Sequence, residues 1–260
     1  MSRKNLAAKP ASSPISQHFL TNRKIIGRLL KFTSITGADL VLEIGTGKGH
    51  ITGALSRQCE KVLTYEINQK LFANLGNRLR DYSNITAVNE DFLKAKLPQK
   101  RPYKVFANIP FSRTTEIVRK LTDSVNSPDE MWLIMAKGAA KGFAGIPCES
   151  VLSASLKPFW EMKITYYFDR RDFHPPPSVD VVMLHFRKKA IPDIPTGNQK
   201  AFVAFLNKGF RNGITAMMTR KQINNALRRA GLKQIEESET MLYVQWLCLF
   251  RNASHIKSFR

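Results

Sequence analysis

The sequence is poor in cysteine, in acidic residues and in long hydrophobic runs. Its three cysteines, Cys59, Cys148 and Cys248, lie far apart and at no metal-ligand spacing, which argues against a disulfide framework or a zinc site. So few thiols are typical of a reducing compartment, and we expect a cytoplasmic protein. No apolar run approaches the ~20 residues that a membrane-spanning helix needs, so no membrane partner is expected.

Acidic residues are outnumbered two to one by basic ones. The 260 residues include 41 Lys and Arg but only 20 Asp and Glu, which gives a formal net charge of +21 and a pI near 10.1. Residues 1–31 contain seven basic residues and no acidic one, and residues 190–260 contain eleven basic and four acidic residues. The positive electrostatic field of such a protein attracts polyanions, and nucleic acid is the first candidate for a partner.

Short apolar segments recur between amphipathic helical segments along most of the chain. The segments 40–44, 62–65, 85–88, 103–107 and 131–135 have the composition of buried strands. Their alternation with helices predicts an α/β fold, a Rossmann-like parallel sheet with helices on both faces. Two later strands, 162–168 and 179–187, have no long helix between them, so we expect them to pair antiparallel at the sheet edge.

The two ends of the chain differ from this middle part. Residues 1–16 are polar, with two prolines, and we expect a flexible basic arm there. Residues 17–189 would form the main domain. A proline-containing linker at 191–197 is followed by helical patterns at 200–208, 214–219, 221–230 and 243–250. We therefore expect residues 190–260 to form a small C-terminal helical domain.

A glycine-rich segment, Glu43–His50 (E-I-G-T-G-K-G-H), follows the first predicted strand. Gly45 and Gly47 allow the backbone to turn tightly and to approach a ligand closely. Ligands of open parallel sheets bind at the carboxyl ends of the strands, where this segment is expected. The glycine pattern alone also fits an NAD-binding protein or a tight turn.

Two further carboxylates follow the second and third predicted strands. Glu66 is positioned to accept hydrogen bonds from both hydroxyls of a ribose. Asp91 could accept from an adenine amino group while Phe92 packs on the ring, or Asp91 could simply cap a helix. The glycine segment, Glu66 and the Asp91-Phe92 pair together favour S-adenosylmethionine as the cofactor, because a dinucleotide-binding site does not need Asp91 and Phe92.

The tetrapeptide Asn108-Ile109-Pro110-Phe111 follows the fourth predicted strand. An adenine amino group is a poor nucleophile because its lone pair is delocalised into the ring. The Asn108 side-chain oxygen and the Ile109 carbonyl could accept from its two N–H bonds and free the lone pair. Pro110 would stiffen the turn, and Phe111 would stack on the base. The tetrapeptide therefore predicts methylation of an amino group on a nucleobase.

A second aromatic residue and two histidines allow further roles. Phe173, between the two late strands, could close the other side of the base or could anchor its loop in the core, and the sequence does not decide between these roles. His18 and His50 have no second histidine or carboxylate at ligand spacing. We therefore expect no metal site, and a structural or solvent-facing position for both histidines.

Several motifs match a known family over nearly the whole chain. They are Ser16–Leu20, Glu43–His50, the tetrapeptide with Thr114–Lys120 behind it, Asp172–Asp180 and Gln245–Phe250. In these motifs the chain resembles the Erm family of 23S ribosomal RNA adenine-N6 methyltransferases, which confer resistance to macrolides, lincosamides and streptogramin B. The resemblance implies a class I methyltransferase fold that binds S-adenosylmethionine. It implies cofactor contacts from Gln17, His18, Leu20, Gly45, Gly47, Glu66, Ile67, Asp91, Phe92 and Asn108.

The resemblance also implies a substrate and leaves two alternatives. The partner would be 23S rRNA, naked or in an assembling large-subunit precursor, and the protein would act as a monomer. The first alternative is a small-subunit rRNA dimethyladenosine transferase, but residues 135–141 (M-A-K-G-A-A-K) lack the Gln-Lys-Glu typical of that family. The second is an RNA-binding factor of the same fold without catalysis, which the intact tetrapeptide disfavours.

One of the implied cofactor-contact positions differs from the family pattern. Many Erm members have Asn where this chain has His18.

Overall fold

The computed structural model describes residues 18–235 and 240–253. The predicted basic arm, residues 1–16, and Gln17 lie outside the described residues. Within them, no helix is both long enough and apolar enough to cross a bilayer.

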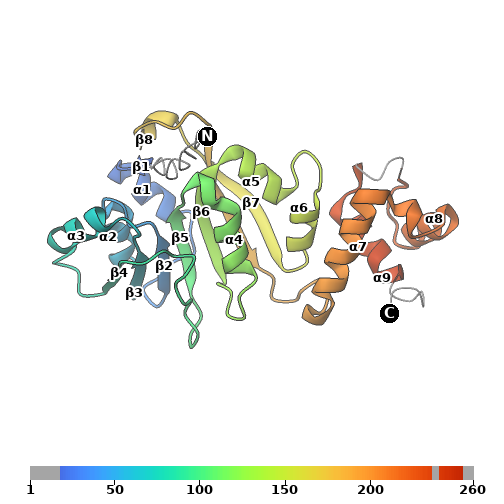
Figure 1. Ribbon diagram of the computed structural model, residues 1–260, viewed down its shortest axis with the longest axis horizontal. Coiled ribbons are helices and arrows are strands. Elements are labelled where there is room, and N and C mark those ends of the chain that lie inside the picture. Colours follow the sequence, from blue (N-terminus) through green and yellow to red (C-terminus); the bar gives the residue numbers. More distant parts are fainter. Residues whose placement is uncertain (1–17, 236–239, 254–260) are drawn as a thin grey trace, which may run out of the picture.

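A seven-stranded sheet in the order β4-β3-β2-β5-β6-β9-β7 forms the centre of the molecule (Figure 1). Its parallel strands are β2 (Leu40–Ile44), β3 (Lys61–Tyr65), β4 (Ile85–Val88), β5 (Lys104–Asn108) and β6 (Glu130–Ala136). The antiparallel strands are β9 (Val181–Lys188) and β7 (Trp160–Tyr167). The predicted α/β fold and the antiparallel pairing of the two late strands are confirmed.

Alternate strand residues pack against helices on opposite faces of the sheet. In β2, Leu40, Leu42 and Ile44 belong to one buried cluster and Val41 to the other. The helices that contribute to the first cluster are α4 (Thr114–Thr122), α5 (Lys137–Ala144) and α6 (Val151–Leu156). The second cluster includes residues of α1 (Arg23–Leu30) and α2 (His50–Ser56), and α3 (Gln69–Arg78) follows β3. Every residue of β2 is buried, as expected for a strand covered on both faces.

The C-terminal helices surround a third buried cluster, separate from the sheet. They are α7 (Gln199–Asn212), α8 (Arg220–Arg229) and α9 (Tyr243–Ala253), and they lie at the far right in Figure 1. Trp246 of α9 is fully buried there, and a Cβ added to Gly209 of α7 would come within 2.5 Å of its ring. The helix predicted at 214–219 is only a 3-10 turn, Ile214–Ala216. The domain boundary after residue 189 falls between β9 and this cluster and stays a prediction.

Candidate functional site

The carboxyl ends of β2, β3 and β5 converge on one edge of the sheet, where the glycine segment turns. Gly45 and Gly47 have φ of +79° and +54°, values that only glycine adopts readily. A Cβ on Gly47 would lie 3.0 Å from two atoms of the Phe19 ring. The loop therefore needs glycine both for its backbone and for the close approach of Phe19, which belongs to β1 (Phe19–Leu20).

Glu66 follows β3 and is 1% exposed. Its Oε2 accepts from the Gly47 N–H at 2.8 Å, and its Oε1 accepts from the Asn68 N–H at 2.8 Å. Each oxygen keeps a second lone pair, so the fixed carboxylate can still accept from two neighbouring hydroxyls. This donor and acceptor pattern fits a ribose diol.

Two small cavities meet at Gly45, Glu66 and Pro110, and each has a volume of about 60 Å³. The first is also lined by His18, Phe19, Gly47, Asn108, Ile109 and Phe111. The second is also lined by residues that include Tyr65, Ile67, Asp91, Phe92 and Arg113. Most of the sequence-predicted site residues are therefore brought together. Phe19 and Arg113 line the site but were missed, because neither occurs in a pattern that marks a ligand.

Asp91 faces the second cavity with both oxygens engaged. Oδ1 accepts from the Leu93 N–H at 2.9 Å, and Oδ2 accepts from Arg113 at 3.1 Å. Burial acts to raise the pKa of Asp91, but these two donors outweigh burial and hold the pKa below its usual range. The carboxylate caps the turn after β4, and it remains on the cavity wall where an adenine amino group would need an acceptor.

The Asn108 side chain is oriented by the segment before β1. Its Nδ2 donates to the His18 carbonyl at 2.7 Å, and no described residue donates to its Oδ1. The acceptor end of the amide is therefore left for a ligand. Ile109 is 2% exposed, and its N–H donates to the Ile134 carbonyl at 3.2 Å, which fixes the tetrapeptide to β6.

His18 links the tetrapeptide to the proline-rich loop. Its ring stacks on Phe111 with the centroids 5.7 Å apart, and its Nδ1 donates to the Pro175 carbonyl at 2.8 Å. His18 thus has a structural contact on each side. No group of three or more potential metal ligands gathers among residues 18–235 and 240–253.

Phe173 and Leu20 do not line either cavity. Phe173 lies in β8 (Phe173–His174), pairs with Leu20 of β1, and is 2% exposed. Its ring centroid lies 5.2 Å from that of Phe168 within the second buried cluster. The structure therefore supports a core anchor for Phe173, and its role in closing over a base stays a prediction. The Leu20 side chain, 3% exposed, is likewise part of the core, and its cofactor contact stays a prediction.

Glu43, the first residue of the glycine segment, lies in β2 and is 1% exposed. Its Oε2 accepts from the Thr52 and Thr64 hydroxyls at 2.7 and 2.8 Å. Burial raises the pKa of Glu43 from 4.5 to about 8 despite these two donors. The raised pKa favours the neutral form of this carboxyl.

The raised pKa of Glu43 predicts a loss of stability with rising pH. Between pH 4.5 and about 8 the folded state keeps a proton that the unfolded chain releases, so folding becomes less favourable across this window and is flat above it. Glu43→Gln should remove this component and reduce the fall in Tm between pH 5 and 8 by at least about 2–4 °C. Thermal denaturation at four pH values measures it, with the exposed Glu90→Gln as control. Parallel Tm curves for wild type and Glu43→Gln would contradict this assignment.

Known proteins share this architecture over most of the chain. The family model for ribosomal RNA adenine dimethylase matches residues 10–253. The chain belongs to this family. The methyltransferase is 30% identical over 237 residues to rRNA adenine N-6-methyltransferase of Lysinibacillus sphaericus, covering 91% of this chain and 94% of that one. The Escherichia coli protein of the same name is 27% identical with the same coverage.

Two solved structures extend the comparison. The 23S rRNA methyltransferase ErmE superposes with a TM-score of 0.81 at 26% identity, covering 91% of this chain and 99% of ErmE. A dimethyladenosine transferase from Plasmodium falciparum gives 0.71 at 20% identity over 91% of this chain and 98% of its own, a likeness of fold alone. The resemblance to the Erm family is confirmed, and the protein is an S-adenosylmethionine-dependent rRNA adenine N6-methyltransferase.

Proposed function

We propose that the methyltransferase modifies N6 of one adenine in 23S rRNA, giving N6-mono- or dimethyladenine, and thereby confers macrolide, lincosamide and streptogramin B resistance. The observation that carries this proposal is the full-length likeness to ErmE, a 23S rRNA methyltransferase. The M-A-K-G-A-A-K segment at the end of β6 supports it, since the small-subunit relatives typically carry Gln-Lys-Glu there. We also propose that the enzyme acts as a monomer in the cytoplasm, on naked rRNA or a large-subunit precursor.

The cofactor would be held across the two small cavities. Glu66 would accept from the ribose hydroxyls, Asp91 and Phe92 would bind the adenine, and Ile67 would cover it. Gly45 and Gly47 leave the space that a Cβ would fill, next to Asn108 and His18. S-adenosylmethionine supplies, when bound, a methyl group already activated by its sulfonium.

The chain's own part in the chemistry is to position and polarise the target amino group. The Asn108 Oδ1 and the Ile109 carbonyl would each accept one amino N–H, so the amino nitrogen becomes more tetrahedral and its lone pair is less delocalised into the ring. Neither group has to remove a proton before transfer, and rate enhancement comes from orientation. A base in structured RNA has to be turned outward to reach the first cavity.

Stacking on Phe111 should contribute to substrate binding. Phe111→Ala should lower kcat/KM for rRNA about 5- to 100-fold, because base–aromatic stacking is worth ~1–3 kcal/mol. Phe111→Tyr keeps the ring and should stay within about threefold of wild type. Steady-state methyl transfer measures both variants, and Phe32→Ala, which removes an aromatic side chain that is 53% exposed, is the control. Equal losses of kcat/KM in Phe111→Ala and Phe111→Tyr would contradict a stacking role for Phe111.

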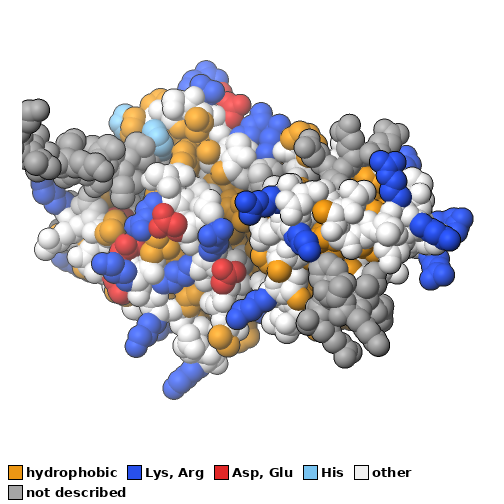
Figure 2. Space-filling model, turned by 45° about the vertical axis from the view of Figure 1, so that its right-hand side comes forward, with side chains coloured by type: hydrophobic (Ala, Val, Ile, Leu, Met, Phe, Trp, Pro, Cys, Tyr) orange, Lys and Arg blue, Asp and Glu red, His pale blue; other side chains and the backbone are white. Residues whose placement is uncertain are grey.

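The basic helices would hold RNA phosphates. Lys and Arg side chains outnumber acidic ones on the face shown in Figure 2, and α8 exposes Arg220, Lys221, Arg228 and Arg229. Because phosphate contacts release counterions, RNA affinity should fall steeply with salt.

The test of the proposed function is transfer of tritiated methyl groups to purified large- and small-subunit rRNA, followed by mapping of the modified base. We expect label at one adenine of 23S rRNA, and expression of the protein should raise macrolide resistance in a sensitive host. Label in the small subunit would favour the dimethyladenosine transferase alternative. RNA binding without label in either would favour a non-catalytic factor.

A further inference from the structure

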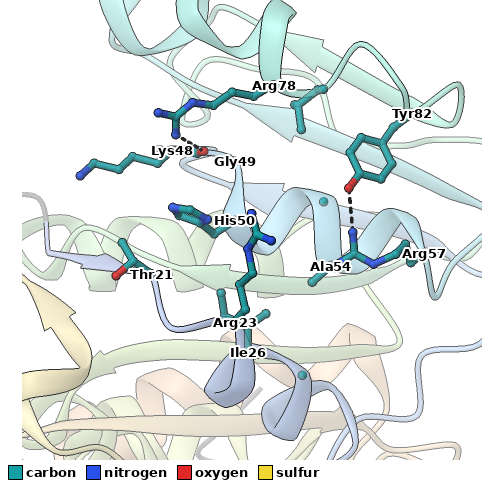
Figure 3. Close-up of a pocket in the computed structure, with 13 residues that line it drawn as sticks. Thr21, Arg23, Ile26, Lys48, Gly49, His50, Ala54, Arg57, Arg78 and Tyr82 are labelled. Atoms are coloured by element: carbon teal, nitrogen blue, oxygen red, sulfur yellow. Dashed lines mark hydrogen bonds between the residues drawn. The ribbon is translucent and has the colours of Figure 1, made fainter.

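A basic cavity lies on the other side of the glycine segment from the methyl-transfer site. Its volume is about 600 Å³, and it is bounded by α1, α2, the end of α3 and the turn that carries Tyr82. Figure 3 shows its basic residues around one space: Arg23 from α1, Lys48 from the turn before α2, His50 from the start of α2, Arg57 directly after α2 and Arg78 from α3. None of the described residues that line it is acidic.

The four cations of this cavity have no carboxylate partner in the part of the chain that the structure describes. None of the salt bridges between described residues involves Arg23, Lys48, Arg57 or Arg78. Neutral acceptors hold two of them in place instead. Arg57 donates to the Tyr82 hydroxyl at 2.7 Å, and Arg78 donates to the Lys48 carbonyl at 3.1 Å. Their positions are therefore fixed while their charge stays uncompensated, which favours an anionic ligand.

The positive charges of this cavity also affect the pKa of His50. Burial, followed by the neighbouring charges of Arg78, Arg23 and Lys48, holds the pKa of His50 below its ordinary value. Burial and the three neighbouring cations therefore both favour the neutral form of His50. A neutral His50 remains a hydrogen-bond donor to an anion through one ring nitrogen.

The cavity is separated from the methyl-transfer site by one aromatic side chain. The Lys48 ammonium lies over the Phe19 ring, 5.1 Å from its centroid, and Phe19 also lines the first small cavity beside Asn108. An anion bound at Lys48 therefore lies one side chain from the place proposed for the target base. If a polyanionic chain places a base against Asn108, the phosphates next to that base would lie at this cavity.

We propose that this cavity binds backbone phosphates of the substrate RNA beside the target adenine, as an RNA contact separate from the basic C-terminal helices. The proposal rests on the proposed function for the nature of the substrate. Cations in and beside three helices match the repeated charges of a nucleic-acid backbone, with neutral His50 as a further donor. Such contacts position the chain without reading its sequence.

The experiment compares two double variants in RNA affinity. Arg23→Gln/Arg57→Gln removes two cavity charges, and Lys61→Gln/Lys100→Gln removes two exposed charges that do not line the cavity. Affinity for purified 23S rRNA is measured against salt concentration, and S-adenosylmethionine affinity is measured by calorimetry. The cavity variant should bind RNA about tenfold or more weakly and with a log–log salt slope smaller by about 1–2. The control should change little, and cofactor affinity should be unchanged in both.

Other outcomes would overturn the proposal. Equal losses of RNA affinity in the cavity and control variants would show that the effect depends on net charge alone. Wild-type RNA affinity in the cavity variant, with loss of AMP or pyrophosphate binding at constant ionic strength, would assign the cavity to a small phosphate ligand. Arg23→Lys/Arg57→Lys should restore RNA affinity, which separates charge from folding. If wild type methylates neither rRNA, the proposed function fails, while the binding comparison still tests this cavity.

Discussion

Replacing Asn108 by alanine should reduce the rate of methyl transfer about 10²- to 10³-fold and leave S-adenosylmethionine affinity within about threefold of wild type. The magnitude is that of removing one preorganised hydrogen-bonding group from a reacting centre. The Asn108 Nδ2 is held by the His18 carbonyl at 2.7 Å, so the Oδ1 is fixed as an acceptor before any ligand binds. Single-turnover transfer to 23S rRNA measures the rate, and calorimetry measures cofactor binding.

Asn108→Asp is the informative companion to the alanine variant. Aspartate keeps an acceptor near the Oδ1 position but loses the N–H that donates to the His18 carbonyl. It should therefore be slower than wild type and clearly faster than Asn108→Ala. Turnover near the wild-type rate in Asn108→Ala would refute the acceptor role. Equal rates in both variants would show that the orientation of the side chain by His18, rather than its oxygen, sets the rate.

Removal of the Glu66 carboxylate should weaken S-adenosylmethionine binding about 10²- to 10⁴-fold. Hydrogen bonds to a charged group contribute about 1.5–3 kcal/mol each, and Glu66→Ala would remove two proposed bonds to the ribose. It would also leave the Gly47 and Asn68 N–H groups, each now 2.8 Å from a carboxylate oxygen, without this acceptor. Calorimetric titration with the cofactor measures the loss.

The matched control for Glu66 is Glu60→Ala, which removes a carboxylate exposed at the start of β3 and paired with Arg101 at 2.8 Å. This variant should bind the cofactor as wild type does. RNA affinity should be unchanged in both variants, because neither residue lines the basic cavity. Cofactor affinity within a factor of about three of wild type in Glu66→Ala would rule out the ribose contact.

Local sequence patterns were sufficient for the sheet and for most of the candidate site. Parallel strands buried on both faces are mostly apolar, as in β2 apart from Glu43, and residues at their carboxyl ends meet because the strands run in one direction. This is why Gly45, Glu66, Asp91 and Asn108, distant in sequence, line adjoining cavities.

Features that depend on long-range contacts could not be predicted. Strands β1 and β8 have only two residues each, too few to show a periodicity, and their pairing decides that Phe173 is buried. Arg113 is recognisable only once the fold brings it 3.1 Å from Asp91. The basic cavity likewise draws its charges from residues in and beside three helices, whose proximity the sequence does not reveal.

Strand β9 lies between β6 and β7 although β7 precedes it in the chain. During synthesis, β2 to β6 can assemble as soon as they emerge, but β6 then keeps an unpaired, apolar edge. Strand β7 cannot join the sheet before β9 is made, so both wait until residue 188 has left the ribosome. Unpaired edges promote aggregation. A chain that stops before residue 181 should therefore aggregate rather than form a smaller stable enzyme, and the order of translation is part of how this protein reaches its folded state.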